Sequence, residues 1–130
     1  MHFLADPRYL RLVRDQVKGV AEEVGIAAKT GSEIVMAVNE ACMNIMQHAY
    51  KGDVSGEIIL EMHCSEEEVE VHLKDFAPPL DPSKVRPRDL DDIRPGGLGT
   101  FFMQEMMDDC RYASTEGHLG NHLRMRKRIV

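Results

Sequence analysis

The sequence lacks tryptophan, a set of cysteines suited to disulfides, and any long apolar run. Its three cysteines, at positions 42, 64 and 110, are odd in number and widely spaced, which favours free thiols in a reducing compartment. No apolar run approaches the roughly 20 residues of a membrane-spanning helix, and the first six residues lack the basic and apolar regions of a signal peptide. We therefore expect a cytoplasmic protein that does not associate with a membrane.

An excess of basic charge is absent as well. The formal net charge is −6, whereas nucleic-acid binders normally present a basic face. The composition therefore argues against a direct nucleic-acid partner. The basic cluster at residues 124–128 follows an alternating pattern, and we interpret it first as the solvated face of a last strand and second as a partner-binding patch.

The sequence does contain enough apolar residues for one core. A chain of 130 residues with 43% hydrophobic residues fits a single domain spanning residues 1–130 and leaves no room for a second. Nine methionines suit either core filling or an adaptable partner surface. Of these two interpretations, core filling is the simpler.

Two amphipathic helices are predicted in the first part of the chain. Asp6 and Pro7 suit a helix start, and apolar residues then recur every three or four positions until Gly25 ends the helix. Thr30 and Glu33 predict a capping box at the start of a second helix. The apolar arc of that helix is wide, so we expect it to be mostly buried.

The rest of the chain predicts strands and a third helix. Alternating side chains predict a hairpin of residues 57–64 and 69–73, and two closing strands near residues 110–114 and 121–129. Between these pairs, residues 96–99 open a third helix. Helices on one face of a mainly antiparallel sheet make an α+β fold, a two-layer α/β sandwich.

The segment from Phe76 to Pro95 separates the hairpin from the third helix and holds five of the six prolines. Loops this long in a small domain are often lids or binding loops. The alternative is a surface excursion without a role, and the residues alone do not decide between the two.

Three polar features are candidates for chemistry, and the first lies on the second predicted helix. Glu40, Asn44 and His48 are four residues apart and therefore share one side of that helix, with Gln47 beside them. Such a stripe is either a solvent-exposed face or, on a helix this apolar, a set of buried polar groups that need partners. A metal-bound nucleotide would supply such partners.

Asp75 and a glycine pair are the other two features. Asp75 ends the predicted hairpin, where a carboxylate either accepts a hydrogen bond from an exocyclic amine such as that of adenine or caps a turn. Gly97 and Gly99, followed by Thr100, stand at a helix start, where backbone N–H groups and the helix dipole favour an anion. The sequence contains neither a GxxxxGK(S/T) phosphate loop nor a GxGxxG dinucleotide pattern.

The order of these features resembles that of the Bergerat-fold ATPases and kinases. In that superfamily a helix carries Glu-x-x-x-Asn, a hairpin ends in Asp, a lid follows, and Gly-x-Gly enters the next helix. The run from Glu40 to Tyr50 resembles the N box of the anti-sigma-factor serine kinases in particular. The resemblance extends over nearly the whole chain and implies the two-layer fold, with an ATP lid at residues 76–96.

The resemblance also implies roles for the matching residues. Asn44 corresponds to the Asn that ligates Mg²⁺, Glu40 to the general base that accepts a hydroxyl proton, and Asp75 to the adenine-binding Asp. The phosphate-binding glycine box corresponds to Gly97, Leu98, Gly99 and Thr100. His48 lies beside this site and is interpreted as structural. Ala77 stands in the first glycine box, where the family usually has glycine, and this departure leaves the strength of nucleotide binding open.

The function that the resemblance implies is phosphoryl transfer from ATP, with Mg²⁺, to a serine or threonine of a small partner. The chain would act as an anti-sigma factor in a partner switch. The implied partners are a sigma factor or another regulator, which the kinase holds, and a STAS-domain anti-sigma antagonist, which it phosphorylates. The resemblance also implies a homodimer.

The residues leave three other functions open. One is a nucleotide-gated protein-binding module without catalysis, which phosphotransfer to a partner would distinguish from a kinase. Another is the catalytic part of a histidine kinase, although the predicted first helix contains no histidine that could accept a phosphoryl group. The last is a metal site of His118 and His122 with a cysteine, whose spacing matches no standard zinc pattern.

Overall fold

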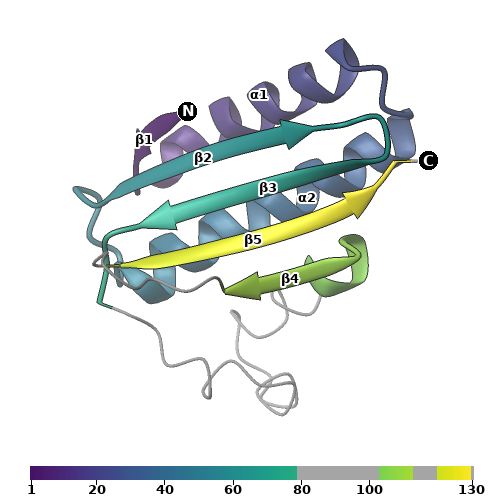
Figure 1. The fold of residues 1–130 in the computed structure, drawn as a ribbon. Helices are drawn as coiled ribbons and strands as arrows, with labels where there is room; N and C mark the ends of the chain where they lie inside the picture. The colour runs from purple at the N-terminus through teal and green to yellow at the C-terminus, as the bar shows by residue number, and fades with distance from the viewer. Residues whose placement is uncertain (79–102, 113–119, 130) are drawn as a thin grey trace.

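The computed structural model describes residues 1–78, 103–112 and 120–129. Within these ranges the chain forms one antiparallel sheet with two long helices against one of its faces (Figure 1), which confirms the α+β two-layer sandwich. Residues 103–106 are also helical. The elements are β1 (His2–Leu4), η1 (Pro7–Tyr9), α1 (Leu10–Glu23), α2 (Ala28–Asn44), η2 (Ile45–Ala49), β2 (Glu57–Cys64), β3 (Glu68–Asp75), β4 (Asp109–Tyr112) and β5 (Asn121–Arg128).

The sheet has the strand order β1-β2-β3-β5-β4, and every neighbouring pair is antiparallel. The register of β3 and β5 places Asp75 opposite Asn121 at one end and Glu68 opposite Arg128 at the other. Directly opposite residues of an antiparallel pair project from the same face. The last side chain of β3 therefore meets the first side chain of β5.

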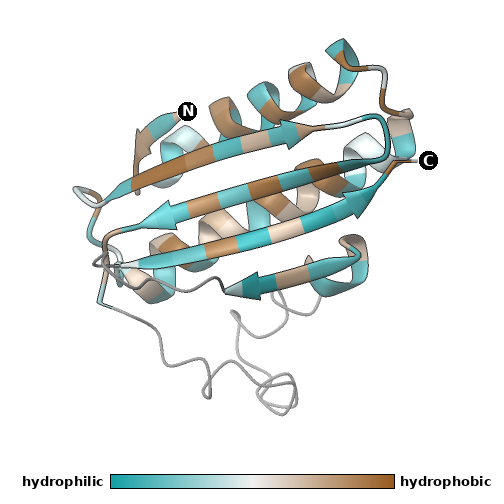
Figure 2. Cartoon of the chain, in the orientation of Figure 1, coloured by the Kyte–Doolittle hydropathy of each residue, from teal (hydrophilic) through white to brown (hydrophobic). Residues whose placement is uncertain are grey.

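The core lies between the helices and the face of the sheet that they cover. Residues on β3 alternate between buried and partly exposed, as a strand with one covered face requires. Figure 2 shows the same alternation as bands of apolar and polar residues along the strands. Fully buried core residues, each with 0% exposure, include Val13, Val17, Ile34, Val38, Val69, Val71 and Leu73.

The connection between the two helices explains one wrong prediction. Gly25, at φ +80°, ends α1, and the N–H of Ile26 donates to the carbonyl of Ala21 at 2.9 Å, as in a Schellman motif. The second helix then begins at once, at Ala28, with Ala27 as its N-cap. The prediction of a capping box at Thr30 and Glu33 is therefore wrong, because both residues already lie inside the helix. Ile26, which lies within this short connection, packs against the core.

The end of the second helix also departs from the prediction. α2 ends at Asn44, and Ile45–Ala49 form a π-helix, in which the N–H of Tyr50 donates to the carbonyl of Ile45 at 2.9 Å. A π-helical turn holds more residues than an α-helical turn. His48 lies within this π-helix, and it is exposed.

Several strand predictions are confirmed and one strand was not predicted. The hairpin of β2 and β3 forms, and Asn121–Arg128 is a strand. β4 covers the described part of the predicted strand near residues 110–114. β1 has only three residues, too few to show an alternating pattern, and lies at an edge of the sheet. Of the predicted lid only residues 76–78 belong to the described part of the chain.

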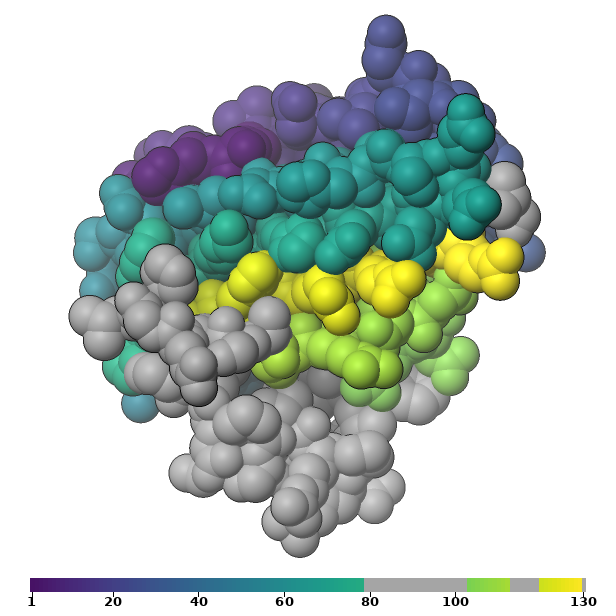
Figure 3. Space-filling view, in the orientation of Figure 1, coloured from purple at the N-terminus to yellow at the C-terminus, as the bar shows by residue number. Residues whose placement is uncertain are grey.

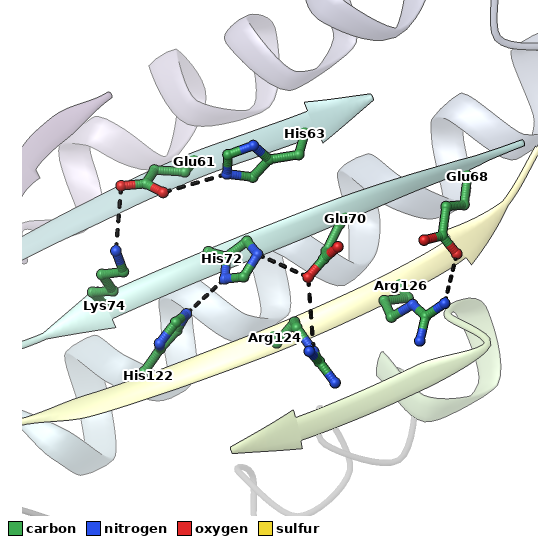
Figure 4. A network of polar contacts seen from close by, with 9 residues as sticks. All are labelled: Glu61, His63, Glu68, Glu70, His72, Lys74, His122, Arg124 and Arg126. Carbon is green, nitrogen blue, oxygen red and sulfur yellow. Dashed lines mark hydrogen bonds and ion pairs between the residues drawn. The ribbon is translucent and has the colours of Figure 1, made fainter. Parts of the chain in front are cut away.

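The uncovered face of the sheet carries a network of charged and imidazole side chains (Figure 4). Arg126 pairs with Glu68 at 2.9 Å, and Arg124 lies 3.8 Å from Glu70. Figure 3 shows side chains of β2, β3 and β5 covering this face together. Arg124 and Arg126 thus belong to a solvated strand face, as interpreted from the sequence. Lys127 differs, because its Nζ binds Glu33 of α2 and the carbonyl of Met106.

Two negative findings concern the described residues. No helix in residues 1–78, 103–112 and 120–129 is long and apolar enough to cross a membrane. In the same ranges no group of three or more His, Cys, Asp or Glu is arranged to hold a metal ion. His122 contacts His72 instead, with Nε2 and Nδ1 2.6 Å apart, and His118 lies outside the described residues.

Candidate functional site

Two buried polar side chains meet where β3 ends and β5 begins. In the part of the chain that the structure describes, Asp75 and Asn121 are the only polar residues classed as buried, with exposures of 4% and 7%. The Asn121 amide nitrogen Nδ2 donates to Oδ1 of Asp75 at 2.9 Å. Because a buried polar group without a partner is costly, each of these residues stabilises the other. We call this the Asp75–Asn121 pair.

Asp75 also organises the chain that follows it. Its Oδ1 accepts a second hydrogen bond, from the backbone N–H of Ala77 at 3.0 Å, which is the pattern of an Asx turn. Asn121 Nδ2 donates further to the carbonyl of Pro78 at 3.3 Å. The turn-capping interpretation of Asp75 is therefore correct. The burial of its carboxylate goes beyond what a turn cap at the surface requires.

The backbone at Gly120 makes this arrangement possible. Gly120 has φ +109°, and a Cβ at this position would overlap the carbonyl oxygen of Asp75. The same Cβ would lie 2.8 Å from Cα of Phe76. Only glycine lets the start of β5 pass this close to the end of β3.

Burial sets the electrostatics of Asp75. Burial raises the pKa of the carboxyl above its ordinary value of 3.8, while hydrogen bonds from Asn121 and from the Ala77 N–H oppose that rise. The hydrogen bonds from the Asn121 side chain and from the Ala77 N–H end on Oδ1, and the backbone of Asn121 also hydrogen-bonds to the carboxylate. An ionised carboxylate has about four acceptor positions. Asp75 therefore retains capacity to accept a hydrogen bond from a ligand.

Ala77, the departure from the family pattern, fits this site. It is 3% exposed and its N–H is held by Asp75. Among the described residues the only non-glycine with positive φ is Lys51. The backbone at Ala77 is thus in a region that any L-residue adopts, and the conformational freedom of glycine is not needed there.

Tyr50 connects the end of the second helix to the end of β3. Its hydroxyl donates to the carbonyl of Glu57 at 2.6 Å and accepts from the N–H of Phe76 at 2.8 Å. The ring lies over Gly56, where a Cβ would overlap it. Burial raises the pKa of Tyr50 above 10.0, which keeps the hydroxyl protonated as a donor. Because Phe76 follows Asp75, this contact holds the C-terminal end of the helix at the same end of the sheet (Figure 1).

Glu40 and Asn44 lie in the C-terminal part of α2, close to Tyr50 in the sequence. Both are half-buried, whereas Gln47 and His48 are exposed. The predicted polar stripe therefore splits into a half-buried part and a solvent-exposed part, and His48 belongs to the exposed part. Asn44 is the last α-helical residue before the π-helix, a feature that often marks functional sites. Carboxylate and amide oxygens are ligands that Mg²⁺ accepts.

The phosphate-binding candidates Gly97, Leu98, Gly99 and Thr100 lie outside the described residues. The sequence did not predict the contacts that three other residues make at this site: Tyr50, Gly120 and Asn121. The one sequence feature that could have indicated Gly120 and Asn121 is a glycine followed by asparagine at the start of a predicted strand. These residues contact Asp75 because of the register between β3 and β5, which cannot be predicted from the alternation of apolar residues in each strand.

The chain matches the family model described as a histidine kinase-like ATPase domain over residues 3–127. It is 33% identical over 121 residues to the serine-protein kinase RsbW of Listeria innocua, covering 87% of this chain and 77% of the relative. It is 32% identical over 122 residues to RsbW of Bacillus subtilis, covering 87% of this chain and 76% of that relative.

A solved structure shows a similar fold. The crystal structure of the RsbU and RsbW domains of Rv1364c from Mycobacterium tuberculosis matches with a TM-score of 0.65 at 18% identity. The match covers 99% of this chain and 32% of that longer polypeptide. This match shows the fold, and the matched family model and the RsbW relatives place the chain in the histidine kinase-like ATPase domain family, in the group of anti-sigma-factor serine kinases.

Proposed function

We propose that this chain is an ATP-dependent serine/threonine protein kinase that acts as an anti-sigma factor in a partner switch. Two findings support the proposal: the membership of the family, and the buried carboxylate of Asp75 at the end of β3. The second carries most weight, because a buried carboxylate with remaining acceptor capacity is costly unless a ligand uses it.

Asp75 and its neighbours fit an adenine base. The exocyclic amine of adenine is a hydrogen-bond donor, and the Asp75 carboxylate is an acceptor in a site of low exposure. Ala77 is small enough to lie beside a flat ring. The close backbone approach at Gly120 keeps larger side chains out of the same place.

Glu40 and Asn44 fit the other end of a metal-bound nucleotide. We assign the Asn44 side-chain oxygen to Mg²⁺ and Glu40 to the proton of the incoming serine or threonine hydroxyl. Bound Mg²⁺ and ATP supply the phosphoryl group and neutralise its developing charge. Glu40 is half-buried one helical turn from Asn44, so the two side chains project from the same side of α2.

The remaining parts of the proposal follow from the family. Gly97, Leu98, Gly99 and Thr100 bind the phosphates, and residues 76–96 form the lid. The kinase holds a sigma factor or another regulator, phosphorylates a STAS-domain antagonist, forms a homodimer and works in the cytoplasm. The relatives named serine-protein kinase RsbW support the kinase activity in this set.

Calorimetric titration with ATP, with and without Mg²⁺, tests the nucleotide site. We expect magnesium-dependent binding in the natural chain and a loss of that dependence in Asn44→Ala. His48→Ala is the matched control, because His48 is one turn further along but exposed. Absence of binding at millimolar ATP would refute the kinase proposal.

Transfer of labelled γ-phosphate to a STAS-domain protein of the same genome tests the activity. We expect transfer by the natural chain and none by Glu40→Gln, with ATP binding retained in that variant. If ATP and the partner bound but no phosphate moved, the chain would be a nucleotide-gated binding module instead.

A further inference from the structure

Lys127 lies on the face of the sheet that the helices cover. In the register of β3 and β5 it is directly opposite Val69, which is 0% exposed. Directly opposite residues of an antiparallel pair project from the same face, so the Lys127 side chain projects toward the helices, and only 14% of it is exposed. An ammonium group in such a place is costly unless partners compensate for its charge.

Two partners from different helical segments compensate for this charge. The Lys127 Nζ donates to Oε2 of Glu33, on α2, at 2.9 Å and to the carbonyl oxygen of Met106. Met106 is the last residue of the helical segment 103–106, and the last carbonyls of a helix have no partner within the helix. The helix dipole also favours a cation at this end. Lys127 therefore joins the end of segment 103–106 to the first half of α2, a contact that we call the Lys127 bridge.

The bridge ends on the side of α2 that carries the proposed catalytic residues. Glu33, Glu40 and Asn44 are separated by seven and then four residues, spacings that place side chains on the same side of an α-helix. All three residues are half-buried. The bridge thus holds segment 103–106 against this side of α2, and it does so about 16 Å along the helix axis from Asn44.

The residues assigned to the phosphates come just before segment 103–106 in the sequence. Thr100, the last of them, precedes Met103 by three positions. In the proposed function these residues bind the phosphates while Asn44, on α2, binds Mg²⁺. The nucleotide would therefore contact two separate parts of the chain, and an error of about 1 Å in their spacing can cost a factor of about 100 in catalysis.

We propose that Lys127 is a positioning residue for the phosphate end of the nucleotide site, because its bridge fixes segment 103–106 relative to α2. This inference rests on the proposed function. Lys127 acts through Glu33 and Met106 and not by contact with the nucleotide. The Asp75–Asn121 pair lies at the opposite end of β3 and β5, so the bridge affects the phosphates and leaves the base-binding end unchanged.

Two substitutions of Lys127 separate its charge from its packing. Lys127→Met removes the charge and the donors and keeps most of the apolar stem, whereas Lys127→Arg keeps a cation with several N–H donors. Glu33→Gln is a milder variant, because its amide oxygen still accepts from Nζ while the ion pair is lost. Arg126→Met is the matched control, because Arg126 is the neighbouring residue on β5 and pairs with Glu68 on the uncovered face (Figure 4).

The readout is the ratio of the affinity for ATP with Mg²⁺ to the affinity for adenosine, both measured by nuclear magnetic resonance titration. Adenosine has no phosphates, so it reports on the base-binding end alone. We expect Lys127→Met to lower this ratio at least about tenfold through weaker ATP binding, with the affinity for adenosine unchanged. Lys127→Arg should restore most of the ratio, Glu33→Gln should show a smaller fall, and Arg126→Met should match the natural chain.

Other outcomes separate this inference from the proposed function. If Lys127→Met unfolded at a lower temperature but kept the natural ratio, Lys127 would be only structural and the inference would be wrong, although the nucleotide site would stand. Equal weakening of ATP and adenosine would lead to the same conclusion. If Lys127→Met did not fold, an unchanged ratio in Glu33→Gln would overturn the inference and a lowered one would support it. If the natural chain bound neither ligand, the proposed function would fail as well.

Discussion

The two ends of the β3–β5 pair each carry a contact between polar side chains, and the two contacts differ in their exposure to water. At the site end, Asp75 and Asn121 are 4% and 7% exposed and hydrogen-bond to each other. At the hairpin end, the Glu68 and Arg126 side chains are 31% and 43% exposed and form an ion pair at 2.9 Å. The first pair is shielded from water, whereas the second remains in contact with it.

Polar contacts that are buried and polar contacts that are exposed differ in what they indicate about function. An exposed ion pair contributes little, because water already solvates both partners. A buried polar pair is expensive to form and is retained where a ligand or a specific structure needs it. The ion pair at the hairpin end therefore only keeps the uncovered face of the sheet solvated. The buried pair at the site end indicates a place where a ligand binds. If this contrast holds, substitutions at the site end should cost more stability and ATP affinity than substitutions of the ion pair at the hairpin end.

Gly120→Ala should be the most disruptive single change. The added Cβ would overlap the Asp75 carbonyl in a positive-φ conformation, so we expect a loss of about 2–4 kcal/mol in the free energy of unfolding. Urea denaturation would measure it. Gly19→Ala is the matched control, because no atom lies within 4 Å of a Cβ there, and it should stabilise α1 by about 0.5–1 kcal/mol. Equal effects of the two changes would contradict the role of Gly120.

Tyr50→Phe should have the next largest effect. It removes the hydroxyl that links Glu57 and Phe76, and we expect a loss of about 1–2 kcal/mol. Because Phe76 follows Asp75, ATP binding should weaken too. Thermal unfolding and calorimetry would measure the two quantities. An unchanged ATP affinity in a destabilised variant would show that the helix end is not coupled to the site.

The imidazole pair of the uncovered face should produce a weak pH dependence. Burial, with His72 and Lys74 nearby, lowers the pKa of His122 below 6.5, and Arg124 adds to this while Glu61 opposes it. Between the lowered value and 6.5 the unfolded chain binds more protons than the folded one, so stability falls as pH drops through 6.5. Because the group is partly exposed, we expect less than about 1 kcal/mol.

A His122→Gln variant tests this dependence. Its stability should change less than that of the natural chain between pH 7.5 and pH 5.5, as measured by urea denaturation at each pH. An identical slope in both proteins would show that another group is responsible.

Arg126→Ala should have the smallest effect. Its partner Glu68 remains solvated after the change, so we expect no measurable shift in the midpoint of thermal unfolding and unaltered ATP affinity. A large loss of stability would mean that the hairpin end resembles the site end, and the contrast between them would not hold.

Periodicity was sufficient to predict the layered fold. Both long helices, the hairpin and β5 are where the apolar patterns place them, because each element has one side facing the core. β1 was not predicted, since three residues carry no period. The start of α2 was misplaced, because Ile26 and the Gly25 turn fix it rather than the Thr30 side chain.

The candidate site was only partly predictable. Asp75 was identified by its place at a strand end, and the family resemblance gave it a role. Asn121 became visible only with the register of β3 and β5, which brings two residues 46 positions apart into contact. His48 lies in a π-helix, which sequence periodicity does not reveal, and its side chain is exposed.

The base-binding role of Asp75 is tested by the affinity for ATP of the natural chain and of Asp75→Asn, measured together with their thermal stability. We predict at least about 100-fold weaker binding in the variant, because an amide nitrogen would replace one acceptor oxygen. The variant should be at least as stable as the natural chain, since the amide oxygen still accepts from Asn121 and no charge is buried. Equal ATP affinity in a folded variant would contradict the assignment of Asp75 as the base-binding residue.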